Sequence, residues 1–304
     1  MKAIVCTRYG PPEVLQLREV EKPAPRESEV CIRIRATAVT SSDCIVRGFN
    51  VPVAFWLPMA LAIGFRRPRK PILGMVFAGE IDSVGKAVTS FKKSDRVFGF
   101  DRFSFGTYAE YKCISEKGLL AGMPGNLGFE EAAAIPYGGL IALAYLAKGS
   151  IQGARKVLVY GASGAVGTSA VQLAKYFGAD VAGICSGANL ELVKSLGADS
   201  VIDYTKDDSM DKGDSYDLTF DAVGKRKSSK LKARISQTPK GKYISVDDGS
   251  PKLSRENLRL LKELAEAGKI RPVIDKRYPL EDMAEAHRYV EQGHKKGNVI
   301  ITVP

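Results

Sequence analysis

The chain has 304 residues, of which 45% are hydrophobic, and this is sufficient for two globular domains of ordinary size. It has no uncharged apolar stretch of the roughly 20 residues that a membrane helix needs, and the N-terminus "MKAIVCTRYG" lacks the zones of a signal peptide, so we expect a cytoplasmic protein without a membrane span. The net charge is +11, but the basic stretch 224–242 lacks interleaved aromatic side chains for stacking bases, so a solvated surface or attraction of an anionic cofactor is favoured over nucleic-acid binding.

Residue types that bind metals or undergo redox chemistry are few. The five cysteines are scattered singly, with no C-x-x-C pair, and are expected to be reduced core thiols. His287 and His294 lie near the C-terminus and are expected to be solvated surface residues, because two histidines without a nearby thiolate make a poor metal site. These residues therefore predict no metal site.

The first third of the chain is typical of β-strands. Residues 29–40 alternate apolar and polar side chains, which is the period of a half-buried strand. Segments 77–85, 95–100 and 106–115 follow, separated by glycine and charged turns. This pattern predicts an antiparallel, barrel-like domain.

Segment 50–71, between the first two of these strands, is rich in aromatic residues and proline. The prolines argue against a long helix, and side chains such as Trp56 and Phe65 are too apolar for a free loop. We expect the segment to pack over a cleft, with residues 51–65 as a candidate substrate lid. An ordinary packed loop or a dimer contact is the alternative.

From about residue 124, helices alternate with short apolar strands, which predicts a parallel sheet covered on both faces. The expected strands are 156–160, 180–184, 200–204, 216–224 and 242–246. The expected helices are 128–148, 165–177, 188–196 and 225–236. An amphipathic helix follows at 254–269, with Ser254 as N-cap and Gly268 as terminator. The last strand, 297–303, is expected to return to the first domain.

A strand, a tight turn and a helix occupy residues 156–177. Ala162, Gly164 and Gly167 have the spacing of the dinucleotide-binding fingerprint, with alanine in the first glycine place. The chemistry requires a turn without Cβ clashes, room for a pyrophosphate against backbone N–H groups, and close packing of helix on strand. We therefore expect the main chain of residues 161–167 to bind the diphosphate of a nicotinamide cofactor.

The end of the second strand of this sheet bears on which cofactor binds. An acidic residue about 20 residues beyond the first glycine would bind a ribose 2′-hydroxyl and select NAD(H). The chain carries Ser186 and Asn189 there, amid positive charge. Because a carboxylate would repel a 2′-phosphate, its absence favours NADP(H).

Six motifs cover much of the chain: "PILGMVFAGEIDSVGKAVTSFKKSDRVFG", "GTYAEY", "AAAIPYGGLIAL", "GASGAVGTSAVQLAK", "KSLGADSVIDY" and "FDAVG". In this order and spacing they resemble the zinc-independent quinone oxidoreductase branch of the medium-chain dehydrogenase/reductase superfamily. The resemblance implies an α/β fold in which a Rossmann doubly wound parallel-sheet domain, residues 124–271, is inserted in a GroES-like antiparallel β-barrel domain, residues 1–123 plus 272–304. It also implies a homodimer.

The resemblance carries site residues over by position. Ala165 and Val166 would present backbone amides to the pyrophosphate, and Asn298 would reach back into the cleft. The adenosine ribose and its phosphate would be surrounded by Ser186, Asn189 and Tyr204, and the nicotinamide side would be lined by Ala222, Val223 and Gly224. The whole expected cofactor site is Gly161, Ala162, Ser163, Gly164, Ala165, Val166, Gly167, Ser186, Asn189, Tyr204, Ala222, Val223, Gly224 and Asn298.

The chain departs from the superfamily's metal-binding pattern. The zinc-dependent branch takes ligands from positions that are here Thr40 or Ser41, Met75 and Pro136, none of which binds zinc well, so no catalytic zinc is expected.

Other departures concern single substitutions and one length difference. Val76, Ser94 and Ile141 replace an aspartate, a glycine and a threonine that are common in the family. The cofactor domain has five expected strands where the family has six, which implies a deletion near 247–253 or residues absent from this numbering.

The resemblance and the missing ligands together imply a zinc-independent, NADPH-dependent oxidoreductase that reduces quinones or α,β-unsaturated carbonyls by hydride transfer. A conjugated acceptor suits such a site, because the negative charge left by hydride delivery is delocalised onto oxygen. A non-catalytic NADPH-sensing or nucleic-acid-binding protein on the same fold is the alternative.

Candidate proton donors are Tyr137 and Asp43 with Ser42, and bulk water competes with them. Each candidate also has a purely structural interpretation. Tyr137 can pack against the nicotinamide, and Asp43 can cap a helix or pair with Arg47.

Overall fold

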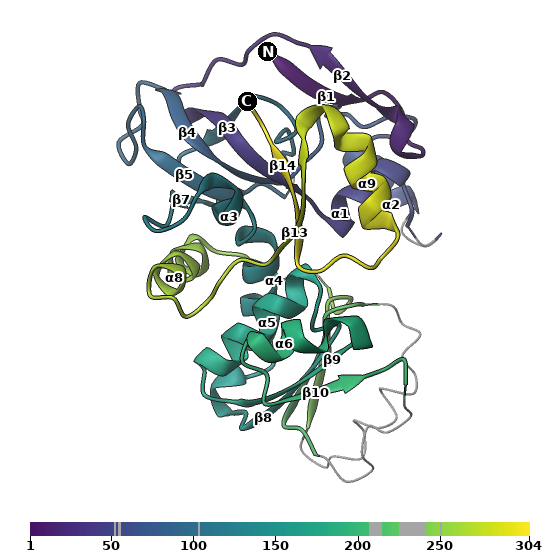
Figure 1. Cartoon of the computed structure of the whole chain (residues 1–304). Helices are drawn as coiled ribbons and strands as arrows, with labels where there is room; N and C mark the ends of the chain where they lie inside the picture. Colours follow the sequence, from purple (N-terminus) through teal and green to yellow (C-terminus); the bar gives the residue numbers. More distant parts are fainter. Residues whose placement is uncertain (52, 54–55, 103, 207–214, 225–240, 250) are drawn as a thin grey trace. The chain divides into compact units, whose positions relative to one another are not determined.

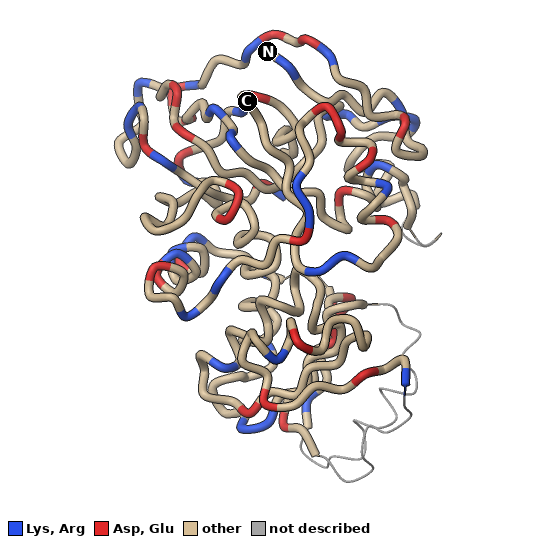
Figure 2. The backbone as a smooth tube through the Cα atoms, in the orientation of Figure 1, with Lys and Arg blue, Asp and Glu red and all other residues tan. Residues whose placement is uncertain are grey.

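The structure is a computed structural model that describes all residues except 52, 54–55, 103, 207–214, 225–240 and 250. The chain forms two compact units (Figure 1): a two-segment unit, Met1–Pro136 with Ile274–Pro304, and a middle unit, Tyr137–Val273. Acidic and basic residues are interspersed over the described parts of both units (Figure 2). The predicted helix 225–236 and nearly all of the basic stretch 224–242 lie outside the described residues. In the part of the chain that the structure describes, no helix is long and apolar enough to cross a membrane.

The two-segment unit is built on a seven-stranded sheet whose central strand is β3 (Glu29–Val39). β4 (Val76–Val84) pairs antiparallel along one edge of β3. Along the other edge lie β6 (Tyr111–Ser115) and then β14 (Asn298–Thr302), both antiparallel. The prediction that the last strand returns to the first domain is therefore confirmed.

The remaining strands of this unit extend the sheet or lie apart from it. β5 (Arg96–Phe100) and β7 (Leu120–Gly122) continue it beyond β4, and β13 (Ile274–Pro279) pairs with β14 in parallel. β1 (Lys2–Cys6) and β2 (Leu15–Glu19) form a separate antiparallel pair. The antiparallel pairing agrees with the fold class predicted for this part of the chain.

Short helices of five to nine residues accompany this sheet in the described part of the chain: α1 (Ser41–Gly48), α2 (Trp56–Ile63), α3 (Phe129–Ala133) and α9 (Met283–Glu291). On α9 the buried side chains are those of Met283, Ala286, His287 and Val290, which follow the i, i+3, i+4, i+7 spacing of a core-facing stripe. The prediction that His287 is a solvated surface residue is therefore wrong, because this side chain is 0% exposed. His294 is exposed, as expected.

The middle unit contains a parallel sheet of five described strands in the order β10-β9-β8-β11-β12. These are β8 (Lys156–Tyr160), β9 (Asp180–Cys185), β10 (Ser200–Asp203), β11 (Leu218–Asp221) and β12 (Lys242–Ser245). The sheet core is apolar and buried, as at Leu158, Ala182 and Ile184. The order places β8 in the middle, so the loop after β8 lies between its two neighbours.

The helices of this part of the chain are α4 (Pro136–Lys148), α5 (Ala165–Tyr176), α6 (Leu190–Ser195) and α8 (Arg255–Glu266). Single 3-10 turns lie at Pro12–Val14, Ile151–Gly153, Gly187–Asn189 and Leu280–Asp282. Ser254 caps α8 as predicted, since its hydroxyl accepts the Asn257 N–H at 3.2 Å. Gly268 follows the helix end with φ of 66°, the left-handed conformation that suits glycine.

The prediction of a single helix over residues 128–148 is wrong in one respect, because two helices occupy this range. α3 ends at Ala133 and α4 begins at Pro136. Proline has no N–H to continue a helix and is well suited to the first turn of the next one. The interruption therefore has its cause in one residue.

The link after β12 is held against α4. The Tyr145 hydroxyl on α4 lies 2.8 Å from the Val246 carbonyl oxygen and 2.5 Å from that of Gly249, and Lys148 donates to the Asp248 carbonyl at 2.8 Å. The length difference expected near 247–253, as a deletion or as residues absent from the numbering, falls on a segment that includes residue 250, which lies outside the described residues.

Candidate functional site

The turn between β8 and α5 brings main chain into unusually close contact. A Cβ built on Gly167 would lie 2.0 Å from the Gly161 carbonyl oxygen and 2.8 Å from the Ala162 Cα. The N–H groups of Gly161 and Ala162 both donate to the Ile184 carbonyl, at 3.0 and 2.9 Å. Gly161 has φ of 75°, a conformation that favours glycine. These residues fold the turn back onto the sheet and set α5 directly against it.

No side chain in the described part of the chain caps the N-terminus of α5. Its cap residue, Gly164, is extended (φ −79°, ψ 176°) and has no side chain with which to satisfy the first-turn N–H groups. A Cβ at Gly164 would approach only the Gly161 carbonyl oxygen, at 3.6 Å. The N–H groups of the first turn and the positive end of the helix dipole can thus receive an anion such as a diphosphate.

The loop that follows β11 lies against the same turn. A Cβ on Gly161 would be 2.4 Å from the Val223 Cγ2, so these two predicted cofactor residues are in contact range. Asp221 fixes this loop: its Oδ1 accepts the N–H groups of Val223 (2.9 Å) and Gly224 (3.1 Å), and its Oδ2 accepts the Tyr243 hydroxyl at 2.7 Å. Ala222 donates its N–H to the Tyr160 carbonyl.

Asp221 was not among the predicted site residues. It is only 2% exposed and ends the apolar strand β11. A carboxylate directly after a buried strand was the available signal, since such a group must be hydrogen-bonded by whatever loop follows.

Three further predicted residues form a polar cluster beside the turn. The Asn189 side chain donates to the hydroxyls of Ser163 (3.2 Å) and Ser186 (3.1 Å). Asn189 is 7% exposed, and its buried Oδ1 has no hydrogen-bond partner among the described residues. An unpaired buried acceptor is costly, and a hydroxyl donor of a bound ligand such as a ribose would satisfy it.

Sequence reasoning missed an acidic residue close to this cluster. Asp203 ends β10, and the parallel register pairs it with Cys185 at the end of β9. A Cβ on Gly187 would lie 2.4 Å from the Asp203 Oδ2. The Thr205 hydroxyl and N–H both donate to Asp203, which lowers the pKa of this carboxyl. The carboxylate expected from the second strand is absent, but one from the third strand reaches the same turn.

Tyr204 and Tyr137 lie at the margins of the middle unit's site. Tyr204 follows Asp203 and is 55% exposed, so its ring is accessible to a ligand. Tyr137 is half-buried in the first turn of α4. A Cβ on the neighbouring Gly138 would be 2.2 Å from the Ala165 carbonyl oxygen, so the first turn of α4 packs on the first turn of α5. This contact holds Tyr137 near the uncapped end of α5.

The other candidate catalytic residues, Ser42 and Asp43, belong to α1 in the two-segment unit. Asp43 forms a capping box with Thr40: its Oδ2 accepts the Thr40 N–H (2.9 Å) and hydroxyl (2.6 Å), while Thr40 accepts the Asp43 N–H. Asp43 is 1% exposed, and burial raises its pKa to about 6 against the lowering effect of these hydrogen bonds. Ser42 is half-buried and Asn298, at the start of β14, is buried.

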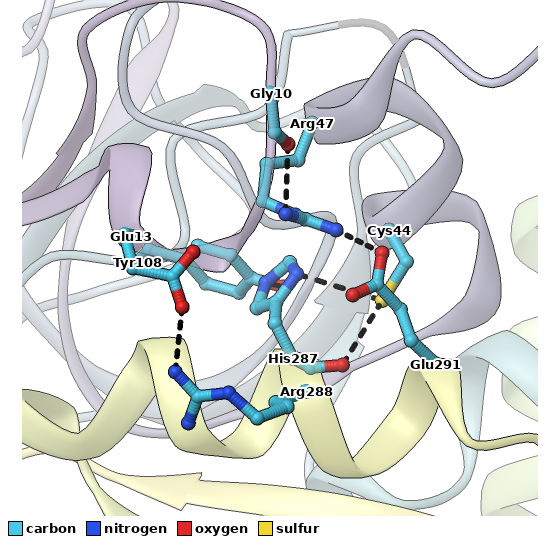
Figure 3. A network of polar contacts seen from close by, with 8 residues as sticks. All are labelled: Gly10, Glu13, Cys44, Arg47, Tyr108, His287, Arg288 and Glu291. Carbon is cyan, nitrogen blue, oxygen red and sulfur yellow. Dashed lines mark hydrogen bonds and ion pairs between the residues drawn. The ribbon is translucent and has the colours of Figure 1, made fainter.

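Arg47 does not pair with Asp43. It donates to the Gly10 carbonyl at 2.8 Å and forms an ion pair with Glu291 of α9 (Figure 3). His287, beside it, lies 3.2 Å from the Tyr108 hydroxyl through Nε2 and 3.5 Å from the Cys44 Sγ through Nδ1. Burial, and then the charge of Arg47, lower the pKa of His287 to about 3, so the ring is neutral. This network joins α1 to α9.

The positions that hold zinc in the zinc-dependent branch do not fit a metal here. The Thr40 hydroxyl donates to Asp43, the Met75 side chain is buried at 4% exposure, and Pro136 has no donor atom. Within the described ranges, no group of three or more His, Cys, Asp or Glu side chains could hold a metal ion. The donor set therefore does not support a catalytic zinc.

Comparisons with known proteins cover almost the whole chain. The model of the alcohol dehydrogenase GroES-like domain matches residues 26–143, and two models described as zinc-binding dehydrogenase match residues 165–248 and 249–301. A 2-methylene-furan-3-one reductase of Solanum lycopersicum is 35% identical over 99% of this chain and 79% of its own. An NADPH-dependent alkenal/one oxidoreductase, chloroplastic, of Arabidopsis thaliana is 32% identical over the same shares. The solved quinone oxidoreductase of Coxiella burnetii superposes with a TM-score of 0.85 at 26% identity, covering 100% of this chain and 99% of that one.

Proposed function

The chain belongs to the medium-chain dehydrogenase/reductase superfamily, in its quinone-oxidoreductase-like branch, and is an oxidoreductase that uses a nicotinamide cofactor. From this premise we propose that it is a zinc-independent reductase of quinones or α,β-unsaturated carbonyls and that it takes its hydride from NADPH. The uncapped N-terminus of α5, with the open space at Gly164, is the observation that carries the proposal. The names of these relatives support the acceptor class, since they are a 2-methylene-furan-3-one reductase, an alkenal/one oxidoreductase and a quinone oxidoreductase.

The residues of the middle unit would each have a distinct role toward the cofactor. The N–H groups of Ala165 and Val166 would bind the diphosphate, and Asn189 would accept a ribose hydroxyl through its unpaired Oδ1. Asp221 would hold Val223 and Gly224 beside the nicotinamide. When bound, the reduced nicotinamide supplies the hydride.

Preference for NADPH over NADH rests on Ser186 and Asn189 at the end of β9, where a carboxylate would select NADH. Asp203 is the opposing feature, because its carboxylate lies beside Gly187 in the following turn. Its Oδ1 is already engaged by Thr205. The hydroxyls of Ser186 and Ser163 can serve as donors to a 2′-phosphate, which supports the phosphorylated cofactor.

Steady-state assays test the proposal directly. Purified protein is given NADPH or NADH with a quinone, an α,β-unsaturated ketone or a saturated ketone, and the absorbance of the reduced cofactor is followed. We expect turnover of the two conjugated acceptors only, and a lower KM for NADPH than for NADH. Binding of NADPH without turnover of any acceptor would favour a cofactor-sensing protein, and absence of binding would overturn the proposal.

A second arm of the assay addresses the proton donor. If Tyr137 donates the proton, Tyr137→Phe should lower kcat by about 10²-fold or more, because general acid catalysis contributes that much, while the Kd for NADPH is retained. Phenylalanine keeps the ring and therefore its packing. Full turnover by the variant would remove the tyrosine from the mechanism and leave Asp43 with Ser42, or water, as the source.

A further inference from the structure

Two of the five cysteines face each other on neighbouring strands, although they are far apart in the sequence. Cys31 on β3 is the register partner of Cys113 on β6. The other cysteines have different neighbours: Cys6 is opposite Leu15, Cys185 is opposite Asp203, and Cys44 lies on α1 against His287. All five are free thiols in this structure. Cys31 and Cys113 are thus paired by the strand register, although their positions in the sequence do not indicate this.

The ladder identifies this pair as one of the closely spaced, non-hydrogen-bonded pairs. The Ile34 N–H donates to the opposite Glu110 carbonyl at 2.8 Å, and the Glu116 N–H donates to the opposite Ser28 carbonyl at 3.0 Å. Since hydrogen-bonded and non-hydrogen-bonded pairs alternate along an antiparallel ladder, Cys31 and Cys113 fall on a non-hydrogen-bonded pair, whose Cα atoms are about 4.5 Å apart. This lies within the range of about 4.4–6.8 Å that a disulfide spans.

The surroundings favour ionisation of Cys31 and keep Cys113 protonated, because the hydrogen bond between the two thiols and then burial raise the pKa of Cys113. Cys113 donates a hydrogen bond to Cys31, which lowers the pKa of the Cys31 thiol. Two charges of opposite sign lie near the same face of the sheet: Asp82 raises the pKa of Cys31, and Lys22, 2.8 Å from Asp82, lowers it. Cys31 is buried, but Cys113 is half-buried, so a small oxidant has access to its sulfur.

We infer that Cys31 and Cys113 are a redox modification site that a hydroperoxide converts into a cross-strand disulfide. The Cys113 thiol passes its proton along its hydrogen bond to the Cys31 sulfur and its own sulfur attacks one peroxide oxygen. The O–O bond breaks, and the products are the Cys113 sulfenic acid and water, or an alcohol from an organic hydroperoxide. The Cys31 sulfur then attacks the Cys113 sulfur, the S–O bond breaks, and a second water leaves. Two thiols are oxidised, one peroxide is reduced by two electrons, and the two thiol protons end in the products.

Peptide mapping provides the test. The full-length protein is treated with a small molar excess of hydrogen peroxide, blocked with N-ethylmaleimide and digested with trypsin without reduction. Cleavage after Arg26, Arg33, Lys112 and Lys117 separates the two cysteines into peptides Glu27–Arg33 and Cys113–Lys117. We expect these two peptides to appear joined, with the loss of two hydrogens, and to separate after dithiothreitol.

Variants and stability measurements make the result specific. Cys113→Ser and Cys31→Ser should each abolish the joined peptide, whereas Cys185→Ser, which removes a buried thiol with no facing cysteine, should retain it. The disulfide closes a loop of roughly 80 residues in the unfolded chain, so peroxide should raise the urea midpoint of the unmodified protein and of Cys185→Ser, but not of Cys113→Ser.

Three results would overturn the inference: sulfinic or sulfonic acid at Cys113 without a joined peptide, a disulfide that maps to other cysteines, or thiols that remain free under these conditions. None of these readouts involves cofactor binding or turnover. The inference therefore stands or falls separately from the proposed reductase activity.

Discussion

Gly164 and Gly167 lie three residues apart in one turn, but a methyl group would meet different surroundings at each. At Gly167 a Cβ would be 2.0 Å from the Gly161 carbonyl oxygen, so the protein's own packing excludes a side chain. At Gly164 that oxygen is 3.6 Å away and φ of −79° suits any residue. The fold therefore tolerates a side chain at residue 164, but that side chain would clash with a diphosphate bound close to the helix N-terminus.

Gly164→Ala should therefore raise the Kd for NADPH at least tenfold, equivalent to about 1.4 kcal/mol, and leave the thermal unfolding midpoint unchanged. Gly153→Ala is the matched control, because a Cβ there meets nothing within 4 Å; it should change neither quantity. Isothermal titration calorimetry and a thermal melt measure the two effects. Unaltered affinity in Gly164→Ala would show that the ligand does not approach this backbone.

Ser94, where the family commonly has glycine, adopts the left-handed conformation with φ of 71°. A Cβ costs roughly 1–2 kcal/mol there, and Ser94 is exposed, so its side chain gains little in return. Ser94→Gly should raise the free energy of unfolding by about 0.5–1 kcal/mol after the greater entropy of the unfolded glycine is subtracted. Urea unfolding checks this. Ser90→Gly, in an exposed position with negative φ, should lower stability, and equal changes in both variants would contradict the backbone explanation.

Most secondary-structure elements could be predicted because their patterns are local. β8 has the predicted bounds, Lys156–Tyr160, because a continuous apolar run between turn residues is sufficient to define a buried parallel strand. The interruption between α3 and α4 was missed, because the helical pattern continues across Ala134 and Ile135 and proline is compatible with a first turn. The local sequence alone does not define this boundary, because a proline can either follow the end of one helix or begin the first turn of the next.

The features of the site that escaped prediction depend on register between distant strands. Asp203 reaches the turn after β9 because β10 pairs with β9 at Asp203 and Cys185. Cys31 and Cys113 meet for the same reason on β3 and β6. His287 was misassigned because a polar side chain can occupy a core-facing position when buried partners such as Tyr108 accept it. The glycine turn was predicted because its chemistry is contained in consecutive residues.

The element α2 bears on the candidate substrate lid, a role that remains a prediction. Its outer side chains are unusually exposed for their type, at 46% for Trp56, 59% for Leu57 and 60% for Leu61. The helix is nevertheless anchored: Trp56 packs edge-on against Phe49 and Phe65, at centroid distances of 5.3 and 6.0 Å, and the Tyr9 hydroxyl bonds to the Gly64 carbonyl at 3.0 Å. An anchored helix with an open apolar side is suited to cover an apolar ligand.

If α2 covers the acceptor, a quinone should quench the fluorescence of Trp56, which is the single tryptophan of the chain. Quenching should saturate with quinone concentration in the presence of NADP⁺, and Leu57→Ser with Leu61→Ser should raise the KM for the quinone several-fold. Leu17→Ser, at a similarly exposed leucine on β2, is the control and should leave KM unchanged. Linear, unsaturable quenching would indicate collision only and would remove α2 from the substrate site.

At the scale of the molecule, segments from both ends of the chain close the two-segment unit. β14 completes the sheet beside β3, and α9 is joined to α1 through Arg47 and Glu291. Two buried titratable groups of this unit, Asp43 and His287, have pKa values shifted in opposite senses in water-excluded positions. The stability of the unit should therefore depend on pH through two opposed contributions.

The signs follow from the shifts. Asp43 titrates near 6 when folded and near 3.8 when unfolded, so between these values the folded state binds the extra proton and the free energy of unfolding rises as the pH falls. His287 titrates near 3 when folded and near 6.5 when unfolded, so over that range the unfolded state binds the extra proton and the free energy of unfolding falls as the pH falls. Between about pH 6 and 4 the two slopes oppose each other in the native protein.

Asp43→Asn removes one slope and exposes the other. The amide oxygen can still accept the Thr40 N–H, so the helix cap is kept. Relative to the unmodified protein, the variant should lose about 2 kcal/mol of unfolding free energy on going from pH 7 to pH 4. The whole shift corresponds to about 3 kcal/mol at about 1.4 kcal/mol per pKa unit, and the unfolded carboxyl is still partly ionised at pH 4. Urea titrations followed by Trp56 emission report on this unit, because the tryptophan lies on α2 within it. Parallel pH profiles for the two proteins would show that Asp43 has the same pKa in the folded and unfolded chain. Asp43 would then contribute nothing to the pH dependence of the unfolding free energy.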